Sequence, residues 1–557
     1  MRGLSMGERT EGNIRVIETD VLVLGSGAAG CGAAIGAKKG GASVLMVDKG
    51  KLESSGCLGG GNDHFMANLN TGPEWDSDEK VINFVKGAPN GVTARMVDKG
   101  WVKVIPIMVK LLEEVGVDFI KNSDGSYVRT VGFGQPGAWW LNIRNGQFVK
   151  RLLAKKIRKM GIHVLDHVMI TKLLKSGDTT SGAIGFNVLD GTFYLLKTKA
   201  MVLALGNCTP RATTNSTRNP FNTWQYPYNV GSYCVLAYEA GAKIINLDVE
   251  HTVTLLPKGY GAPGMNGLNS MGGHELNASG ERFMGKYDPM GENGLRRNQV
   301  LGTYQELIEG KGPPFYMDMR HLSKDDLYLL QNILMVGDKE TYNDYLEQKG
   351  TSFATHPLEV EISEIAFGGK ILMDERFESS VKGLFPGCHF FSFSGAICGG
   401  FSAGTEAAKA GLKTEDLAVD ESEVSGEREK IFRPLQVHAG LSPREFENTI
   451  RQVMDYYMGF VKNEKGIELA LERLKLIEGY MNRIEARDYH ELMRANEVRH
   501  LLKQCQLTTM AVLERRETGR TTYRRSDYPQ LNPELNNKCL VLWQKAGQPQ
   551  LAFETLA

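Results

Sequence analysis

The stretch TDVLVLGSGAAG, residues 19–30, decides the fold of this chain, because it joins an apolar run suited to a buried strand directly to a glycine-rich turn. The following residues, CGAAIGAKKG, are small and compatible with a helix that begins at the turn. A second apolar run, ASVLMVD, ends at Asp48, close to the offset of about 20 residues at which an acid binds a ribose hydroxyl. This order of strand, tight turn, helix and acid predicts a Rossmann-like α/β domain that binds a dinucleotide.

Each glycine of the turn has its own predicted role. Gly25 permits the tight turn, Gly27 lets the backbone approach a pyrophosphate, and Gly30 lets the helix pack closely on the strand. The helix begins near Ala28 and Ala29, and its first N–H groups have no partners within the helix, so they can bind phosphate oxygens. We therefore predict that residues 25–30 bind the pyrophosphate of the nucleotide.

The segment after the acid indicates which dinucleotide is bound. It reads KLESSGCLGGGNDHFMAN, residues 51–68, and is rich in glycine and serine. A domain that binds NAD would continue into another regular βα repeat, whereas a loop of this kind can lie along a flavin. The sequence therefore predicts FAD, with Asp48, Lys49, Ser55 and Gly60 among its contacts.

The composition excludes several classes of partner. Among the 557 residues, 65 lysines and arginines balance 65 aspartates and glutamates, so neither a nucleic acid nor an anionic membrane surface is expected as a ligand. The opening MRGLSMGERTEGNIR has no apolar core, and no stretch approaches the ~20 apolar residues of a membrane span. The eight cysteines include no CxxC pair, which favours free thiols over a metal site. We expect a soluble, cytoplasmic, multidomain enzyme without its own metal and with a small-molecule substrate.

Several further segments are specific enough to identify relatives. They are ESSGCLGGG at 53–61, SGAIGFNVLDGTFYLLKTKAMVLALGN at 181–207, NTWQYPYNVGSY at 222–233, LNASGERFMGKYDP at 276–289, EARDYHELMRANEV at 485–498 and RRETGRTTYRRSDYPQLN at 515–532. On these segments the chain resembles, over nearly its whole length, the flavoprotein subunit of the fumarate reductase and succinate dehydrogenase superfamily. Within that superfamily it looks most similar to the alpha subunit of dissimilatory adenylylsulfate reductase.

The resemblance implies an α/β fold in which a Rossmann-like FAD-binding domain carries an inserted α+β capping domain and is followed by a helical bundle. The implied ranges are 1–232 for the first FAD-binding segment, 233–357 for the cap, 358–425 for the second FAD-binding segment, and 426–557 for the helical domain and C-terminal tail. Apolar residues also recur at spacings of three and four through residues 430–515, which predicts amphipathic helices there.

The resemblance also implies FAD contacts outside the first βα unit. Val168 stands where the backbone of similar proteins meets the adenine, and Ala204 and Gly206 end a buried strand beside the nucleotide. The sequence GGFSAG, with Phe401 and Ser402, is expected to open a helix whose N-terminus faces the pyrimidine end of the flavin.

Two departures from the family concern the flavin itself. Covalent members carry a histidine at the position of Gly56, which has no nucleophile, so the FAD is expected to be non-covalent. Cys388 stands where an acid is expected after VKGLFPG.

The stretch NGLRRNQV, residues 293–300, holds the implied proton donor. Counting on from GERFMGKYDP, Arg297 falls on the arginine that similar fumarate reductases use to protonate the substrate carbon. Because a guanidinium has a pKa above ~12, it can serve only as a relayed donor in a dry site. Its neighbour Arg296 instead matches an arginine of the adenylylsulfate reductase pattern.

The residues with which similar enzymes bind a dicarboxylate are replaced. Asn269 and Ile397 stand for two arginines, and Glu364 stands for a histidine. Losing these cations and adding an anion is expected to repel a dicarboxylate, since each charge-assisted contact contributes about 1.5–3 kcal/mol. Adenylylsulfate is not favoured as a substrate either. In similar enzymes one strand carries the arginines that bind this substrate, and here that strand keeps only His251. The candidate catalytic residues, for a less anionic and larger substrate, are Arg297, His251, Glu364 and Trp224.

The sequence therefore predicts an FAD-dependent oxidoreductase subunit that acts on a small organic or sulfur substrate. The resemblance implies a ferredoxin-like partner subunit with [4Fe-4S] clusters, and hence a hetero-oligomer, since this chain has no cluster-ligand spacing of its own. The alternatives are a non-catalytic electron-transfer subunit of a larger complex, a true adenylylsulfate reductase alpha subunit, or a fumarate reductase.

Overall fold

The computed structural model describes residues 7–11, 14–132, 134–249, 251–261 and 264–555. The main sheet is built from the strands β1 (Gly7–Glu11), β2 (Ile14–Leu24), β3 (Val44–Val47), β7 (His163–Leu165), β8 (Val168–Ser176), β9 (Thr179–Asn187), β10 (Phe193–Leu203) and β20 (Leu384–Pro386). Their order is β7-β3-β2-β10-β9-β8, with β1 beside β2 and β20 beside β10. Strands β7, β3, β2, β10 and β20 run parallel, which confirms the predicted Rossmann-like unit.

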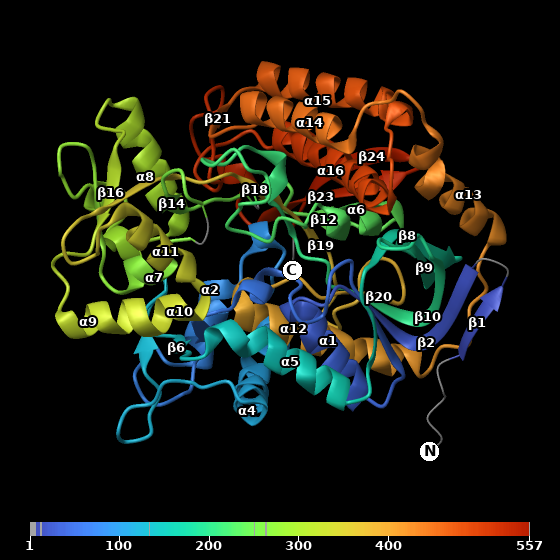
Figure 1. The fold of residues 1–557 in the computed structure, drawn as a ribbon, viewed down its shortest axis with the longest axis horizontal. Coiled ribbons are helices and arrows are strands. Elements are labelled where there is room, and N and C mark those ends of the chain that lie inside the picture. The colour runs from blue at the N-terminus through green and yellow to red at the C-terminus, as the bar shows by residue number, and fades with distance from the viewer. Residues whose placement is uncertain (1–6, 12–13, 133, 250, 262–263, 556–557) are drawn as a thin grey trace.

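The helices α1 (Ala28–Lys39) and α12 (Ser392–Gly411) pack closely against each other beside this sheet (Figure 1). A Cβ added at Gly32 would lie 2.1 Å from Ile397 O, and one added at Gly400 would lie 2.0 Å from Ala29 O. Only residues without side chains allow the two backbones to come this close. The prediction that GGFSAG opens α12 is therefore wrong, because the helix begins at Ser392, and Gly400 and Gly404 of this segment form the contact with α1.

This difference changes the surroundings of Phe401 and Ser402, which lie in the middle of α12. Ser402 is buried and its Oγ lies 3.5 Å from Gly100 O. The Phe401 ring packs against the apolar core, with the Lys39 ammonium 5.8 Å from its centre. Neither residue stands at a helix N-terminus, so the geometric reason for assigning them as FAD contacts is removed.

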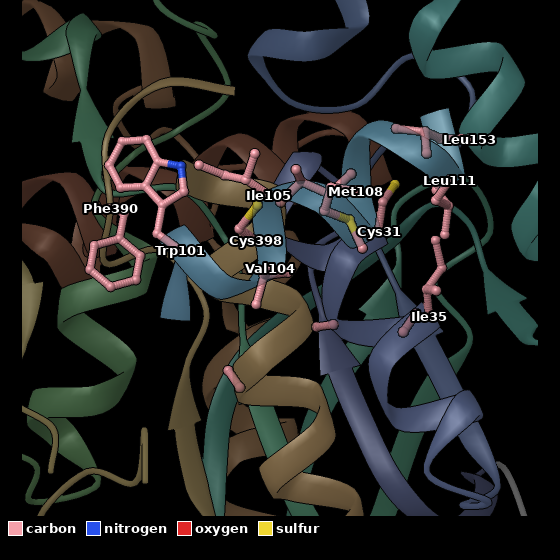
Figure 2. Packing of buried hydrophobic residues seen from close by; sticks show 14 of the residues in the cluster. Cys31, Ile35, Trp101, Val104, Ile105, Met108, Leu111, Leu153, Phe390 and Cys398 are labelled. Atoms are coloured by element: carbon pink, nitrogen blue, oxygen red, sulfur yellow. The ribbon is translucent and has the colours of Figure 1, made fainter. Parts of the chain in front are cut away.

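A large apolar cluster holds α1 and α12 against α4 (Ile105–Val115) and α5 (Val149–Lys159). Figure 2 shows the Trp101 indole beside the Phe390 ring, and the ring centres are 5.6 Å apart. The indole Nε1 donates to Ser394 Oγ at 2.8 Å, so the polar atom of this buried ring has a partner. The cluster therefore fixes the start of α12 relative to the first FAD-binding segment.

The cap is a separate layer, drawn in yellow-green at the left of Figure 1. Its antiparallel sheet has the order β14-β17-β16-β15. The elements are β14 (Leu255–Pro257), α7 (Asn266–Ser270), β15 (His274–Leu276), α8 (Arg296–Ile308), β16 (Phe315–Asp318), α9 (Lys324–Leu329), α10 (Met335–Asp338), α11 (Glu340–Lys349) and β17 (Leu358–Ile362). This confirms an inserted α+β unit. Helix α6 (Ser232–Glu239), inside the range predicted for the cap, packs instead on β8 of the main sheet.

The C-terminal part contains the predicted helices and a hairpin that the sequence did not reveal. The helices are α13 (Glu421–Phe432), α14 (Pro443–Tyr457), α15 (Glu464–Gly479) and α16 (Tyr489–Glu514). The chain then forms a hairpin that joins a four-stranded sheet of order β19-β12-β23-β24, with β12 (Ile244–Ile245), β19 (Lys370–Ile371), β23 (Lys538–Lys545) and β24 (Gln548–Thr555). None of the helices within the described ranges is long and apolar enough to cross a membrane.

Candidate active site

The predicted nucleotide-binding residues meet at the carboxyl ends of three neighbouring parallel strands. The Gly25 N–H donates to Val47 O at 2.8 Å, and the Ala204 N–H donates to Leu24 O at 2.7 Å, so β2, β3 and β10 end together. Val168 begins β8 and its N–H donates to Asp48 O at 2.8 Å. Ligands of open α/β sheets bind at this edge.

The turn between β2 and α1 fits a pyrophosphate. Gly25 has φ +98°, and a Cβ there would lie 2.3 Å from Ala204 O. A Cβ added at Gly30 would lie 1.9 Å from Gly25 O, so the helix approaches the turn as predicted. Helix α1 starts at Ala28 after Gly27, no side chain caps it, and no acidic residue stands in its first turn. Its N-terminal N–H groups are therefore suited to bind phosphate oxygens.

Asp48 holds the loop that follows it. Its Oδ2 accepts from the Ser26 N–H at 2.7 Å, and its Oδ1 accepts from Ser55 Oγ at 2.8 Å. Gly56 has φ +78°, and a Cβ there would lie 2.8 Å from the Cα of Gly27. The glycine-rich loop, with Gly60 in a short helical turn, thus lies directly against the phosphate turn. This arrangement fits FAD, and it shows that position 56 has no room for a histidine unless the loop moves.

Lys49, a predicted FAD contact, also bonds to the C-terminal part of the chain. Its Nζ donates to Glu497 Oε1 of α16 at 2.5 Å and to Tyr228 O at 2.8 Å. Glu497 also accepts from Arg211 Nη2 at 2.8 Å. The Lys49 ammonium therefore ties the segment after β3 to the C-terminal helices.

Gly206 and Cys388 lie together at the same edge. Gly206 has φ +81°, and a Cβ there would lie 2.4 Å from Asn229 Nδ2. Burial raises the pKa of the Cys388 thiol to about 12, although a hydrogen bond with the Gly206 main chain acts in the other direction. Cys388 therefore brings no negative charge to a place where an acid is expected.

Glu364 is a buried acid that contacts Trp224. It lies between β17 and β18 (Ala366–Gly368), and only 1% of the residue is exposed. Its Oε1 accepts from the Trp224 N–H at 3.0 Å. Its Oε2 has no hydrogen-bond partner within the part of the chain that the structure describes. Burial raises the pKa of Glu364 to about 7.

Of the two adjacent arginines, Arg296 is the one that meets Trp224. Its guanidinium lies 5.2 Å from the centre of the Trp224 indole. Burial lowers the pKa of Arg296 to about 10, while the neighbouring Cys208 thiol acts to raise it, so Arg296 remains a cation at neutral pH. Arg297, the predicted proton donor, lies in the first turn of α8 and is exposed to solvent.

His251 belongs to a different set of contacts. It lies in β13 (His251–Thr252), 4% exposed, and its Nε2 is 3.2 Å from Leu247 O. Its ring centre is 4.9 Å from that of Phe367 and 5.0 Å from that of Tyr523. Burial, assisted by the Lys462 charge, lowers the pKa of His251 well below its usual value. The imidazole is therefore a neutral group packed against the C-terminal segment.

Sequence reasoning missed a second charged cluster, formed by Asp63, His64 and Lys339. Asp63 immediately precedes β4 (His64–Met66), and Lys339 stands between α10 and α11 of the cap. Lys339 Nζ lies 2.8 Å from Asp63 Oδ2, and His64 Nδ1 lies 2.5 Å from Asp63 Oδ1. The sequence NDH after the glycine-rich loop marks two of the three residues, whereas nothing local marks Lys339.

Two other positions, Asn269 and Ile397, replace dicarboxylate-binding residues of the family, and their contacts lie elsewhere than at Trp224, Arg296 and Glu364. Asn269 Nδ2 donates to Glu275 Oε1 at 2.8 Å and to Glu292 O at 3.1 Å, inside the cap. Ile397 is fully buried in α12. All eight cysteines are free thiols, and among the described residues no three histidine, cysteine or acidic side chains converge as a metal site requires.

Comparison with known proteins agrees with this geometry. Residues 20–472 match the family model described as FAD binding domain, and residues 447–557 match the model described as fumarate reductase flavoprotein C-term. The chain is 26% identical over 574 residues to one subunit of the fumarate reductase (CoM/CoB) of Methanothermobacter marburgensis, covering 96% of this chain and 98% of that protein.

Two further comparisons involve adenylylsulfate reductase. The chain is 25% identical over 340 residues to the alpha subunit from Megalodesulfovibrio gigas, covering 54% of this chain and 50% of that protein. The adenylylsulfate reductase structure from Archaeoglobus fulgidus matches with a TM-score of 0.84 at 23% identity, covering 97% of this chain and 96% of that chain. The second comparison shows the fold alone.

The fold and its nucleotide edge define an FAD-dependent oxidoreductase. The chain belongs to the FAD-binding flavoprotein family that includes fumarate reductase, succinate dehydrogenase and adenylylsulfate reductase subunits. The predicted resemblance, fold class and FAD cofactor are confirmed.

Proposed function

We propose that this oxidoreductase carries out two-electron chemistry on a small organic acid with one anionic group, held where the cap meets the FAD-binding segments. Bound FAD supplies or accepts the two electrons. Arg296, Trp224 and Glu364 bind and orient the substrate and hold a proton. Glu364 supports the proton transfer, and Arg296 supports the binding of a single anion.

The observation that carries the proposal is the state of Glu364. Its buried carboxyl has one oxygen without a partner in the described chain, and burial raises its pKa to about 7. A carboxyl with this pKa donates or accepts a proton near neutral pH, which is what general acid–base catalysis requires. Most buried polar atoms in proteins have a hydrogen-bond partner, so an unpaired oxygen beside Trp224 supports a role in binding.

Arg296 supports the single-anion substrate. A guanidinium over an indole is held in one plane, and its positive charge attracts one carboxylate. The Glu364 carboxyl accepts a hydrogen bond from the main-chain N–H of Trp224, so Glu364 and Arg296 both contact this tryptophan. An ionised Glu364 would repel a second anion placed nearby.

Fumarate and adenylylsulfate, the substrates named for two relatives, are less well supported. Asn269 is bonded inside the cap and Ile397 is buried in α12, so neither offers a polar contact to a ligand. His251 is neutral and packed against Phe367 and Tyr523, so it adds no cation.

The proposal is tested by titrating the oxidised, FAD-loaded protein with crotonate, a monocarboxylate, while recording the visible absorbance of the flavin. We expect a saturable change whose Kd rises at least about tenfold in Arg296→Met, the loss of about 1.4 kcal/mol. Arg297→Met is the matched control and should bind as the wild type does. If neither crotonate nor a panel of other monocarboxylates perturbs the flavin, and the protein exchanges electrons only with a protein partner, the proposal fails.

We also propose that the chain is the flavoprotein subunit of a cytoplasmic hetero-oligomer with a ferredoxin-like [4Fe-4S] protein. The family resemblance supports this, as does the absence of a cluster-ligand set among the described residues. Purification from the natural source should yield a small brown polypeptide with the flavoprotein. A preparation whose colour and iron content are explained by flavin alone would count against the partner.

A further inference from the structure

A cavity of about 350 Å³ lies between helix α14 and the segment 214–220. It is lined by Thr214, Asn215, Arg218, Pro220, Asn448, Arg451 and Gln452. Two of these described residues are arginines, none carries a carboxylate, and Pro220 is the one apolar residue in the set. Small-molecule sites occupy about 300–1,000 Å³, so the cavity has room for a small ligand. Its lining suits a polar molecule with negative charge.

The loop that carries Arg218 is held by its own hydrogen bonds. The buried Asn215 amide donates to Asn219 O at 2.8 Å and to Asn222 O at 3.0 Å. The Arg218 N–H donates to Asn215 O at 3.1 Å. These contacts position Arg218 at the cavity without using its guanidinium.

The second arginine of the cavity, Arg451, belongs to a charged cluster that has more cations than anions. The cations are Arg211, Arg451, Arg494 and Lys49, and the carboxylates that they share are Glu447 and Glu497. Arg218 adds one more positive charge, and Asp455, which accepts from the Thr214 N–H at 2.8 Å, adds one negative charge. The surroundings of the cavity therefore keep an excess of positive charge, and partial burial strengthens its attraction for an anion.

The cavity also offers hydrogen-bond donors that the described chain does not use. Within the described ranges, the side chains of Arg218 and Gln452 have no hydrogen-bond or ion-pair partner. The Asn448 Oδ1 accepts from Arg451 Nη1 at 2.7 Å, which turns the Asn448 amide so that its NH₂ group is left to donate elsewhere. One guanidinium and two amide groups can thus donate to the oxygens of a ligand, and the planar fork of arginine matches phosphate oxygens especially well.

We propose that this cavity binds the phosphate group of a small molecule, at a site separate from the FAD edge and from Trp224, Arg296 and Glu364. A phosphate group carries a charge of about −1.5 to −2 at neutral pH and has several strong acceptor oxygens, so it fits both the positive excess and the unused donors. The inference goes beyond the proposed function, because none of the cavity residues belongs to the proposed substrate contacts. The ligand chemistry is shared by the free ion and by a phosphate ester.

Isothermal titration calorimetry of the FAD-loaded protein tests the inference, since bound FAD fills the nucleotide edge. The probes are inorganic phosphate, glycerol 3-phosphate and succinate, at one fixed ionic strength. We expect saturable binding of a phosphate probe with a Kd on the order of 1 mM or lower. Arg218→Gln removes a donor and a charge, and Gln452→Glu places a carboxylate in the cavity, so each should raise this Kd at least about tenfold.

The matched control is Arg444→Gln, which removes an exposed arginine of α14 that does not line the cavity, and it should bind the probes as the wild type does. Arg218 and Gln452 are also exposed, so their replacement should leave the FAD content and the Tm unchanged. Tighter binding of glycerol 3-phosphate assigns the site to a phosphate ester, and tighter binding of inorganic phosphate assigns it to the free ion. Three results overturn the inference: no saturable binding of either phosphate probe, equal Kd values in Arg218→Gln and Arg444→Gln, or succinate binding as tight as that of the phosphates.

Discussion

The main-chain N–H of Trp224 donates to Glu364 Oε1 at 3.0 Å, and this is the hydrogen bond that holds the buried acid. The second oxygen of Glu364 has no partner within the described ranges. Folding therefore removes a carboxyl from water and replaces only part of its hydration. The consequence is a carboxyl that resists ionisation, and this can be measured in the stability of the protein as well as in its activity.

Glu364→Gln should stabilise the protein at alkaline pH. The folded-state pKa of Glu364 is raised to about 7 by burial, so its contribution to stability is fully present below the unfolded pKa of ~4.3 and is lost as the pH rises through 7. Glutamine has no charge to bury, so the unfolding free energy of Glu364→Gln should exceed that of the wild type by an amount that grows to the order of 3 kcal/mol by pH 8. Urea unfolding of both proteins at pH 5 and pH 8 measures it. A difference in unfolding free energy that does not change with pH would show that Glu364 ionises normally.

Arg296→Lys should depress turnover strongly, whereas Arg297→Lys should leave it close to the wild-type rate. Lysine keeps the charge but lacks the planar fork that lies over Trp224, so a geometric role is damaged. Loss of one preorganised donor typically costs about 10²–10³ in rate. Steady-state kinetics with the natural electron donor or acceptor compare the two variants. The opposite ranking would return the proton-donor role to Arg297.

The sequence predicted those parts of the site that depend on short-range spacing. Gly25, Gly30 and Asp48 lie where the βα motif places them, because the turn and the strand lengths are local properties. Sequence spacing could not decide which of Arg296 and Arg297 contacts Trp224. One residue turns a helix by about 100°, so choosing between Arg296 and Arg297 requires knowing which side of α8 faces Trp224.

Two further differences have physical causes that no short motif reveals. The glycines of GGFSAG look like a turn before a helix, but they allow α12 to touch α1 at its middle. Lys339 lies 276 positions from Asp63 in sequence, so their ion pair appears only when the cap is folded onto the FAD-binding segment.

All flavin should be released when the protein is precipitated with acid. Gly56 offers no nucleophile, and its φ of +78° with a Cβ position 2.8 Å from Gly27 Cα leaves no room for a histidine. Absorbance at the flavin maximum in the supernatant and in the washed pellet measures the two fractions. Yellow colour that stays with the pellet would indicate a covalent bond to another residue.

Fumarate should reoxidise the reduced flavin slowly or not at all. Asn269 is bonded within the cap, Ile397 is buried, and Asp63 already compensates Lys339, so no described cation awaits a second carboxylate at these positions. Stopped-flow absorbance under anaerobic conditions measures the rate. Reoxidation at an ordinary enzymatic rate, on the order of 10 per second, is the result that would contradict this.

Glu497→Gln should destabilise the protein and weaken FAD binding together. Glu497 is fully buried between Lys49, Arg211 and Arg494, and although burial opposes ionisation these cations hold its pKa below the usual range. Removing its charge leaves buried cations under-compensated, at a cost of about 3–5 kcal/mol. It also frees Lys49, which adjoins Asp48 at the nucleotide edge, so the loop that contacts FAD should loosen.

The matched control for this change is Glu478→Gln, which removes an exposed carboxylate paired with Lys503 at 3.2 Å in the same helical part of the chain. An exposed pair contributes at most about 1 kcal/mol. Urea unfolding and equilibrium dialysis of FAD, performed on both variants, separate the two positions. Because Glu497 has a depressed pKa, its stabilisation is present above the unfolded pKa and declines as the pH falls, so the gap between the variants should narrow below pH 4. Equal, small effects of both substitutions would show that the Lys49 to Glu497 contact does not hold the nucleotide loop.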